Sequence, residues 1–237
     1  MTKNRYSRNI LTIGAEAQDR LALGSVFIIG CGALGGHTAM LLAGAGVGRI
    51  GIADFDTVDI SNLQRQLYFS ESEAGEYKVG RLASRMRALN SEIKVEEYRT
   101  LIRRDNAREI LGDYDFIIDA TDNPATKYLI DDLCLEIGKP GCIGGVAGWR
   151  GQVVSVCGCK DGERTMRFGD IFPCPDADPS MLPCEIEGVI GAAASIISSV
   201  QASEAIKYLT GEGEMLFNKA YVMNLKDLSF DVLSFEG

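Results

Sequence analysis

The stretch 25–56 reads SVFIIGCGALGGHTAMLLAGAGVGRIGIADFD and decides the fold. An apolar run at 26–29 ends in a glycine-rich turn, and a second apolar run at 49–53 ends in Asp54. The segment between them has the length and the apolar content of a helix. The order of strand, glycine turn, helix and strand predicts the repeating unit of an α/β sheet.

The glycines of this turn, Gly30, Gly32 and Gly35, follow the spacing G-x-G-x-x-G. Glycine lets the backbone turn tightly and approach a phosphate, and the helix that follows offers free N–H groups to that anion. Asp54 comes roughly 20 residues later, where such an acid accepts hydrogen bonds from ribose hydroxyls. The stretch therefore predicts a nucleotide site. The alternative is a strand–helix turn with no ligand.

The composition favours one cytoplasmic α/β domain over residues 1–237. The chain is 46% hydrophobic, and no linker rich in Pro, Gly and Ser divides it. A net charge of −9 argues against non-specific nucleic-acid binding, which needs a basic surface. No apolar run reaches transmembrane length, and the first ten residues lack the core of a signal peptide. The seven cysteines are odd in number and scattered, which predicts reduced thiols.

A polar loop, 57–66, follows the second strand and contains Asn62, Arg65 and Gln66. Open α/β sheets bind ligands beyond the carboxyl ends of their strands, where this loop would lie. Lys78 then begins a helix expected over 78–90, although the helix dipole disfavours a cation at that end. A bound anion would explain its position. The alternative is a solvated surface lysine.

Asp122 follows a strand expected over 114–119 and would face the same crevice as the glycine turn. Asn123 precedes Pro124 and makes a good N-cap for a helix over 124–137, so Asp122 is not needed as the cap. An acid beside phosphates would repel them unless it held a cation. Asp122 is therefore predicted to bind magnesium, and the alternative is an ordinary loop carboxylate.

The rest of the chain continues the alternation of strands and helices. Strands are expected at 93–98, 140–146 and 152–156, helices at 105–111 and 189–209, and one or two closing strands within 215–235. The segment 160–187 has four prolines and no sustained period. A connection of that length in a compact domain is usually a lid or a binding loop, so a mobile crossover loop is expected there.

Four features combine into a resemblance to a known family. They are Arg-Tyr-Ser-Arg at 5–8, Asp-Phe-Asp at 54–56 running into Ser-Asn-Leu-Gln-Arg-Gln at 61–66, Lys78, and Asp-Ala-Thr-Asp-Asn at 119–123. Together they closely resemble the ThiF/MoeB/HesA family, the prokaryotic relatives of ubiquitin-activating enzymes, over nearly the whole chain. The resemblance implies a Rossmann-like, doubly wound, mostly parallel sheet with helices on both faces and a few antiparallel closing strands.

The resemblance also implies an activity. Enzymes of the family use MgATP to adenylate the C-terminal glycine of a ubiquitin-like sulfur-carrier protein that ends in Gly-Gly, and they release pyrophosphate. The chemistry suits the residues, because an ionised carboxylate needs no general base to attack the α-phosphorus. The obstacle is charge repulsion between the carboxylate and the triphosphate, which cations and a metal relieve.

The resemblance assigns roles to individual residues. Asp54 would bind the ribose, and Asp122 would coordinate magnesium. The arginine that matches Arg8 reaches the ATP of the partner subunit in the family, which implies a homodimer. The remaining nucleotide-binding set comprises Gly30, Gly32 and Gly35 under the phosphates, Asp56, and Asn62, Arg65, Gln66 and Lys78 around the triphosphate.

The sequence departs from the family at its cysteines. Many members hold zinc with two C-x-x-C pairs, whereas here no cysteine follows Cys184 and the pair at 157–159 is a C-x-C. Tetrahedral zinc needs four ligands, so no zinc site is expected. Cys184 resembles the family's loop cysteine, which in some members links covalently to the carrier. The alternative for Cys184 is a free thiol.

Other functions are compatible with the same residues. The same adenylation chemistry could act on a small-molecule, peptide or tRNA-borne carboxylate, and the absence of the zinc pairs favours such a change of acceptor. A nucleotide-binding scaffold protein is the non-enzymatic alternative, although retention of Arg65, Lys78 and Asp122 together argues against it. A dehydrogenase is disfavoured because no acid/base for hydride transfer stands out downstream.

Overall fold

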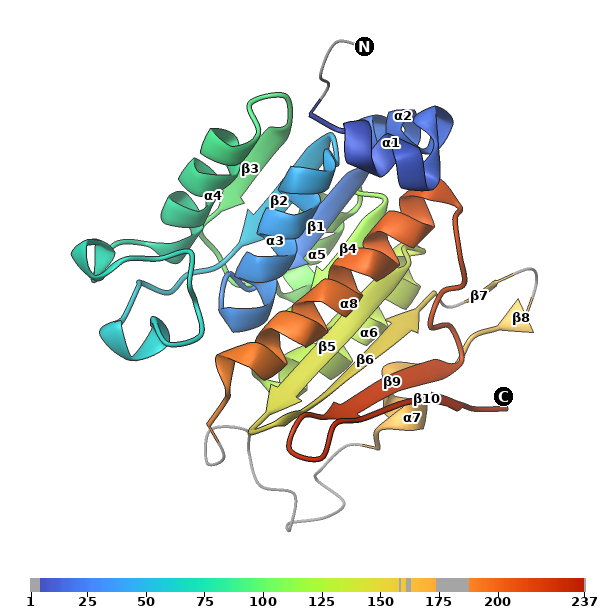
Figure 1. The fold of residues 1–237 in the computed structure, drawn as a ribbon. Helices are drawn as coiled ribbons and strands as arrows, with labels where there is room; N and C mark the ends of the chain where they lie inside the picture. Colours follow the sequence, from blue (N-terminus) through green and yellow to red (C-terminus); the bar gives the residue numbers. More distant parts are fainter. Residues whose placement is uncertain (1–4, 158, 161–162, 174–187, 237) are drawn as a thin grey trace.

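The computed structural model describes residues 5–157, 159–160, 163–173 and 188–236. Its centre is an eight-stranded sheet in the order β10-β9-β6-β5-β4-β1-β2-β3 (Figure 1). The strands of this sheet are β1 (Ser25–Ile29), β2 (Arg49–Ala53), β3 (Lys94–Tyr98), β4 (Phe116–Asp119), β5 (Gly141–Ala147), β6 (Arg150–Val156), β9 (Lys219–Asn224) and β10 (Ser229–Ser234). A separate two-stranded ribbon pairs β7 (Cys159–Lys160) with β8 (Glu163–Arg164).

The sheet has a parallel part and an antiparallel part. β3, β2, β1, β4 and β5 are parallel neighbours, whereas β6, β9 and β10 are added antiparallel. After β1 the chain moves to β2 on one side, and it later returns to β4 on the other side. The carboxyl ends of β1 and β4 therefore form a topological switch point, where open α/β sheets bind ligands. The fold class predicted from the sequence is confirmed.

Helices cover both faces of the sheet (Figure 1). α3 packs against α4 and α8 on one face, and α5 and α7 pack against α6 on the other. The α-helices are α1 (Ser7–Ile13), α2 (Ala15–Leu23), α3 (Ala33–Ala45), α4 (Lys78–Leu89), α5 (Arg104–Leu111), α6 (Pro124–Ile137), α7 (Phe168–Ile171) and α8 (Gly191–Thr210), with 3-10 turns η1 (Ile60–Asn62) and η2 (Glu71–Glu73). None of the described helices is long and apolar enough to span a bilayer.

The central strand β1 explains why both faces are covered. Val26 and Ile28 belong to the core beneath α3, α4 and α8, whereas Phe27 and Ile29 belong to the core beneath α5 and α6. Because alternate side chains point to opposite faces, a strand that is apolar at every position needs a helix layer on each side. The run at 26–29 therefore requires the three-layered arrangement.

α8 attaches to its surroundings through buried polar side chains as well as apolar ones. Ser198 donates to the Leu34 carbonyl at 2.9 Å, and Gln201 donates to the Asp119 carbonyl at 2.7 Å. Glu204 accepts a hydrogen bond from the Ser155 hydroxyl on β6. These bonds reach α3, β4 and β6, so they fix the rotation and the axial position of α8.

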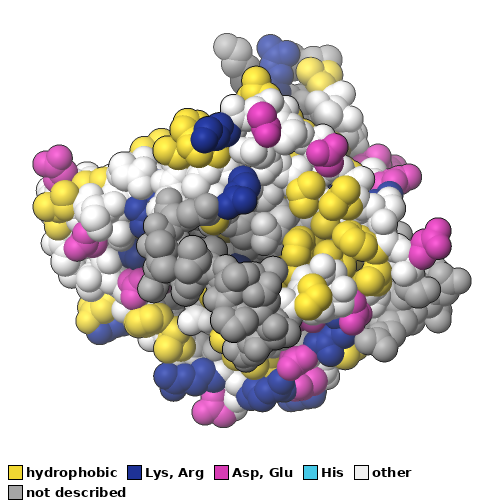
Figure 2. All heavy atoms as spheres, turned by 90° about the horizontal axis from the view of Figure 1, so that it is seen from below, with side chains coloured by type: hydrophobic (Ala, Val, Ile, Leu, Met, Phe, Trp, Pro, Cys, Tyr) yellow, Lys and Arg dark blue, Asp and Glu magenta, His cyan; other side chains and the backbone are white. Residues whose placement is uncertain are grey.

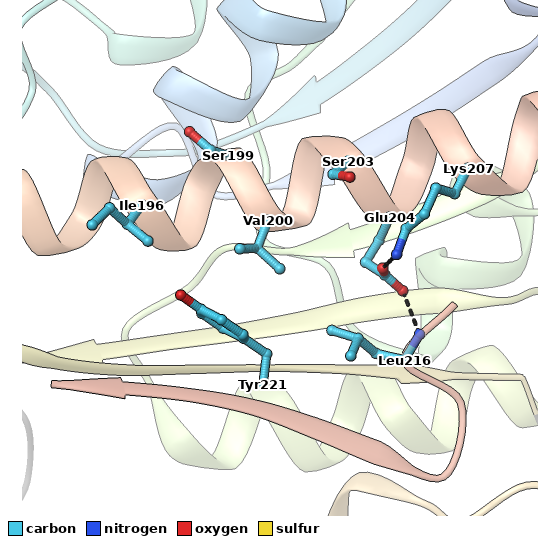
Figure 3. Close-up of a pocket in the computed structure, with 8 residues that line it drawn as sticks. All are labelled: Ile196, Ser199, Val200, Ser203, Glu204, Lys207, Leu216 and Tyr221. Atoms are coloured by element: carbon cyan, nitrogen blue, oxygen red, sulfur yellow. Dashed lines mark hydrogen bonds and ion pairs between the residues drawn. The ribbon is translucent and has the colours of Figure 1, made fainter. Parts of the chain in front are cut away.

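A groove of about 370 Å³ lies between the outer side of α8 and β9 (Figure 3). Figure 3 shows Glu204 at its edge, paired with Lys207 and accepting the Leu216 N–H at 2.8 Å. This carboxylate therefore ties the segment after α8 back to the helix. None of the residues predicted to bind the nucleotide lines this groove.

The segment expected to be a crossover loop, 160–187, contains short elements where it is described. α7 lies within it, and Arg167 just before α7 pairs with Asp131 at 3.1 Å and also with Asp132. Tyr128 donates to the Phe172 carbonyl at 2.9 Å. These contacts fasten 167–172 to α6, and residues 174–187 lie outside the described part of the chain.

Candidate nucleotide site

The glycine turn lies at the switch point between β1 and β4. Gly30 has φ +95°, and a Cβ there would lie 2.9 Å from the Ala120 carbonyl oxygen. A Cβ on Gly35 would lie 1.8 Å from the Gly30 oxygen, so the start of α3 packs directly on the turn. At Gly32 the nearest atom to a Cβ is Gln66 Nε2 at 3.7 Å. Gly32 thus presents open backbone, as close approach of a phosphate requires.

Asp54 connects the end of β2 to this turn. Its carboxylate accepts the Cys31 N–H at 2.6 Å and the Asp56 N–H at 2.8 Å. Burial raises the pKa of Asp54, while the two backbone N–H bonds and the charge of Lys78 lower it. Each carboxylate oxygen keeps accepting capacity beyond its one backbone bond. The geometry is therefore compatible with the predicted contact to ribose hydroxyls.

The loop after β2 brings the next group of predicted residues beside the turn. The Asn62 carbonyl accepts the N–H groups of Arg65 and Gln66, each at 3.0 Å, so the three residues form one compact bend. Gln66 is only 3% exposed, and its Oε1 has no hydrogen-bond partner among the described residues. Arg65 donates to the Ser61 carbonyl at 3.0 Å, and α8 begins against it at Gly191.

Lys78 is buried, so the alternative of a solvated surface lysine is wrong. The residue is 6% exposed, and its ammonium pairs with Asp56 at 3.2 Å. The Asp56 carboxylate therefore compensates the positive charge of Lys78 at the first turn of α4. From the sequence, only a bound anion was expected to compensate this charge. An ammonium has three donors. Asp56 thus holds Lys78 in place and leaves donor capacity for a further acceptor.

A buried ion pair lies beneath the loop that carries Asp122. Lys127 donates to the Asp119 carboxylate at 2.9 Å and to the Thr121 carbonyl at 2.6 Å. The other Asp119 oxygen accepts the N–H and the hydroxyl of Thr121. Asn123 caps α6 through the Thr126 N–H, as predicted. Asp122 itself is exposed, so the bonds of its neighbours set its position.

Lys127 and Gln201 hold this loop from α6 and α8, and neither residue stands out in the sequence. The only local signal is that Lys127 lies on the first turns of the helix that follows the Asp-Ala-Thr-Asp-Asn motif. Its partners Asp119 and Gly144 come from two different strands. Pairings of this kind become visible only when the fold is known.

Arg8 lies apart from the other predicted residues. It belongs to α1, where Asn9 donates to the carbonyl of Ala45 at the end of α3. The glycine turn is at the beginning of α3, and 13 residues of helix span about 20 Å at 1.5 Å per residue. Arg8 therefore lies at the opposite end of the sheet from the nucleotide site of its own chain.

The three buried cysteines do not present a nucleophile to the site. Cys31, Cys134 and Cys142 are buried and free, and burial raises the pKa of each thiol. Within the described ranges no cluster of three or more His, Cys, Asp or Glu side chains could hold a metal ion. Cys184 lies outside those ranges, so its role and the expected lack of zinc both stay predictions.

The sequence matches the ThiF family over residues 6–236. The chain belongs to the ThiF family. This ThiF-family chain is 39% identical to the adenylyltransferase and sulfurtransferase MOCS3 of Dictyostelium discoideum, over 97% of the chain and 52% of that protein. It is 35% identical to the sulfur carrier protein adenylyltransferase of Thermus thermophilus, over 98% of the chain and 86% of that protein. The chain spans about half the length of the MOCS3 relatives.

Solved structures support the same fold. Crystal structures of E. coli MccB superpose on this ThiF-family chain with TM-scores of 0.86 for MccB with MccA-N7isoASN and 0.83 for MccB with ATP. The sequence identities are 22% and 23%, over 99% of this chain and 73% and 72% of those chains. At this identity the likeness establishes the fold and nothing finer.

The geometry suits a nucleotide with several phosphates. Open backbone at Gly32, a fixed acid at Asp54 and a cation at Lys78 lie around one point of the sheet, and Arg65 approaches it from the adjoining loop. An anion at the start of α3 would meet free N–H groups and the positive end of the helix dipole. Among the described residues, the site thus combines an acid placed where it could accept hydrogen bonds from a ribose with donors suited to phosphates.

Proposed function

We propose that this chain is an ATP-dependent adenylyltransferase. It activates the C-terminal glycine carboxylate of a ubiquitin-like sulfur-carrier protein that ends in Gly-Gly, forming an acyl-adenylate and releasing pyrophosphate. The sulfur transfer served by this activation belongs to thiamine, molybdopterin or related cofactor biosynthesis. The names of the D. discoideum and T. thermophilus relatives agree with this prediction.

One observation carries the proposal. The open glycine turn has Asp54 bonded to it on one side at 2.6 Å and Gln66 beside it on the other. An acid at the ribose position suits a nucleoside, and the cations Arg65 and Lys78 suit a triphosphate more than a nicotinamide. This combination favours nucleotidyl transfer over hydride transfer.

The residues of the site have two roles, which are nucleotide binding and stabilisation of charge in the transition state. Gly30, Gly32 and Gly35 allow the phosphates to approach the backbone, and Asp54 orients the ribose. The larger set around the triphosphate comprises Asp56, Asn62, Arg65, Gln66 and Lys78. The substrate carboxylate attacks the α-phosphorus as an anion, so the cations of this set lower the barrier by offsetting charge in the transition state.

Asp122 is the residue that we propose to hold magnesium. It is exposed at the switch point, and the bonds of Asp119 and Thr121 fix the backbone that carries it. Mg²⁺ is commonly bound by one or two carboxylates together with substrate phosphates, so a three-ligand protein cluster is not required. The ion would neutralise phosphate charge when bound.

A protein substrate is favoured over a small molecule by an exposed apolar surface at the β10 edge of the sheet. Figure 2 shows hydrophobic side chains gathered on the side of the molecule where β9 and β10 lie. The exposed large apolar residues of β10 and the turn before it are Leu228, Phe230, Val232 and Leu233. Contiguous exposed apolar surface is a mark of protein–protein contact.

We further propose that residues 1–237 act as one adenylation domain in a cytoplasmic homodimer. α3, which is about 20 Å long, separates the glycine turn from the α1 end of the chain that carries Arg8. A catalytic role for Arg8 therefore needs a second chain, in line with the family pattern. The odd number and scatter of the seven cysteines favour a reducing compartment.

The proposal is tested by pyrophosphate–ATP exchange with Mg²⁺ against a panel of carrier proteins ending in Gly-Gly and a panel of small carboxylic acids. Exchange stimulated by one carrier would establish both the reaction and the partner. Exchange only with a small carboxylate would replace the carrier by a small-molecule substrate. ATP binding with no exchange on either panel would support a nucleotide-binding scaffold.

Two variants connect the reaction to the site. Arg65→Ala and Asp122→Ala are expected to abolish exchange while leaving the folded state intact, because both side chains lie at least partly in solvent. Circular dichroism provides the control for folding. Exchange near the parental rate in either variant would remove that residue from the mechanism.

A further inference from the structure

Tyr68 lies between the glycine turn and the loop that carries Arg65 and Gln66. Its side chain is buried, with the ring against the first turn of α3, where a Cβ on Gly36 would lie 1.8 Å from Tyr68 Cζ. The rings of His37 and Phe69 meet it edge-on at centroid distances of 5.3 and 4.7 Å. A glycine is therefore needed at position 36 to make room for the Tyr68 ring. No ligand is required to account for it.

The hydroxyl of Tyr68 donates to the carbonyl oxygen of Gly32. The same oxygen accepts the Gly36 N–H at 3.0 Å, which is the first hydrogen bond of α3. Burial raises the pKa of the Tyr68 phenol, so the hydroxyl keeps its proton and remains a donor at neutral pH. The Gly32 carbonyl is thus held by two donors that approach from the helix side.

Fixing this carbonyl also fixes the next N–H. In a planar trans peptide, the Gly32 C=O and the Ala33 N–H point in opposite directions. The N–H groups of Ala33, Leu34 and Gly35 have no acceptor among the described residues, as expected for the first turn of a helix. With its carbonyl turned toward Tyr68, the Gly32–Ala33 peptide directs its N–H out of the helix end, where an anion would bind.

The backbone of Tyr68 is anchored on another element of the site. Arg85 of α4 donates to the Tyr68 carbonyl and also pairs with Glu73 at 2.6 Å. α4 begins at Lys78, so the contacts of Tyr68 join the glycine turn to the helix that supplies the buried cation. A single residue therefore links three elements that surround the proposed phosphate position.

We propose that Tyr68 is a positioning residue for the triphosphate: its hydroxyl orients the Gly32–Ala33 peptide so that the Ala33 N–H points at a phosphate. This role rests on the proposed ATP site and deepens it. Tyr68 does not touch the nucleotide and acts through the turn. Its removal should therefore weaken nucleotide binding more than it slows chemistry.

The test compares Tyr68→Phe with Tyr128→Phe. Each substitution removes one tyrosine hydroxyl that donates to a backbone carbonyl, but the Tyr128 bond joins α6 to Phe172, away from the glycine turn. Calorimetry gives the Kd for ATP, carrier-dependent exchange gives KM and kcat, and thermal unfolding gives Tm. Tyr68→Phe is expected to raise the Kd and the KM for ATP about 3- to 10-fold, the effect of one lost hydrogen bond, with kcat changed by less than about 2-fold.

The control separates positioning from packing. Tyr128→Phe is expected to lower Tm without a change in ATP affinity. Parental ATP affinity in Tyr68→Phe, or an equal loss of affinity in both variants, would overturn the role of Tyr68 alone. A parental protein that binds no ATP would overturn the proposed function and this role together, so the two failures are distinguishable.

Discussion

Removal of the Lys127 ammonium should destabilise the protein severely. Lys127 is 7% exposed and Asp119 is fully buried, and the two are paired at 2.9 Å. Lys127 also donates to the carbonyls of Thr121 and Gly144 at 2.6 and 2.5 Å. Lys127→Met keeps most of the side-chain volume, but it leaves a buried carboxylate without its cation and removes a donor from each of two carbonyls.

The magnitude follows from this geometry. Breaking a buried pair by removing one partner costs about 3–5 kcal/mol, since the remaining charge is uncompensated. Ordinary domains have a free energy of unfolding of about 5–15 kcal/mol, so the variant should be close to the limit of folding. The double variant Asp119→Asn with Lys127→Met removes the stranded charge and should recover about 1–3 kcal/mol of that loss.

Urea denaturation followed by circular dichroism measures both effects. Lys226→Met is a matched control, because Lys226 is exposed in the segment between β9 and β10, and it should change stability by less than about 0.5 kcal/mol. A cost below about 1 kcal/mol for Lys127→Met, or a double variant less stable than the single one, would refute the reasoning.

Three further predictions concern other parts of the structure. Gly35→Ala should cost more than about 2 kcal/mol and abolish ATP binding in calorimetry, because its Cβ would lie 1.8 Å from a backbone oxygen of the turn; a stable variant with parental affinity would contradict this packing. The hydrogen bond from Arg49 lowers the pKa of Glu96 from 4.5 to about 2. The stabilisation that this pair gives the folded state is therefore complete above pH 4.5 and is lost as the pH falls toward 2. Glu96→Gln should therefore lose on the order of 2 kcal/mol at pH 7 and flatten the acid limb of stability against pH, and an unchanged acid limb would count against the pair. Mixing inactive Arg8→Ala and Arg65→Ala chains should restore about a quarter of parental exchange if Arg8 acts across a two-fold interface, whereas no recovery after subunit exchange would exclude that arrangement.

The sequence predicted the parts of the fold that depend on local pattern. The run at 26–29, the glycine turn and the run ending at Asp54 define strand, helix and strand without reference to the rest of the chain. The helix over 124–137 was also predicted with its observed bounds, since Asn123 and Pro124 form a strong local start signal. Hydrophobic period and capping chemistry are properties of short windows, so they can be read from the sequence.

The parts that could not be predicted depend on contacts between distant residues. Lys127 reads as one more lysine on an amphipathic helix, and its role appears only when β4 and β5 bring Asp119 and Gly144 to it. Tyr68 lies in a segment without periodicity, and its ring reaches α3 across more than 30 positions of sequence. The expectation that Lys78 needs a bound anion was incomplete for the same reason. Asp56, 22 positions away in the sequence, compensates part of the Lys78 charge.

The three polar anchors of α8 have a consequence for how this chain tolerates changes of length. Each added residue turns a helix by about 100° and advances it by about 1.5 Å. A single insertion near Ala202 would rotate Glu204 away from Ser155 while leaving Ser198 on Leu34. The Ser198 and Glu204 hydrogen bonds could then not form together. The turn at 225–228 can lengthen without moving either strand, because residues 226–228 are exposed and the turn only joins two antiparallel strands at the edge of the sheet. Tags, linkers or reporter domains should therefore leave the fold intact in that turn and disrupt it throughout the middle of α8.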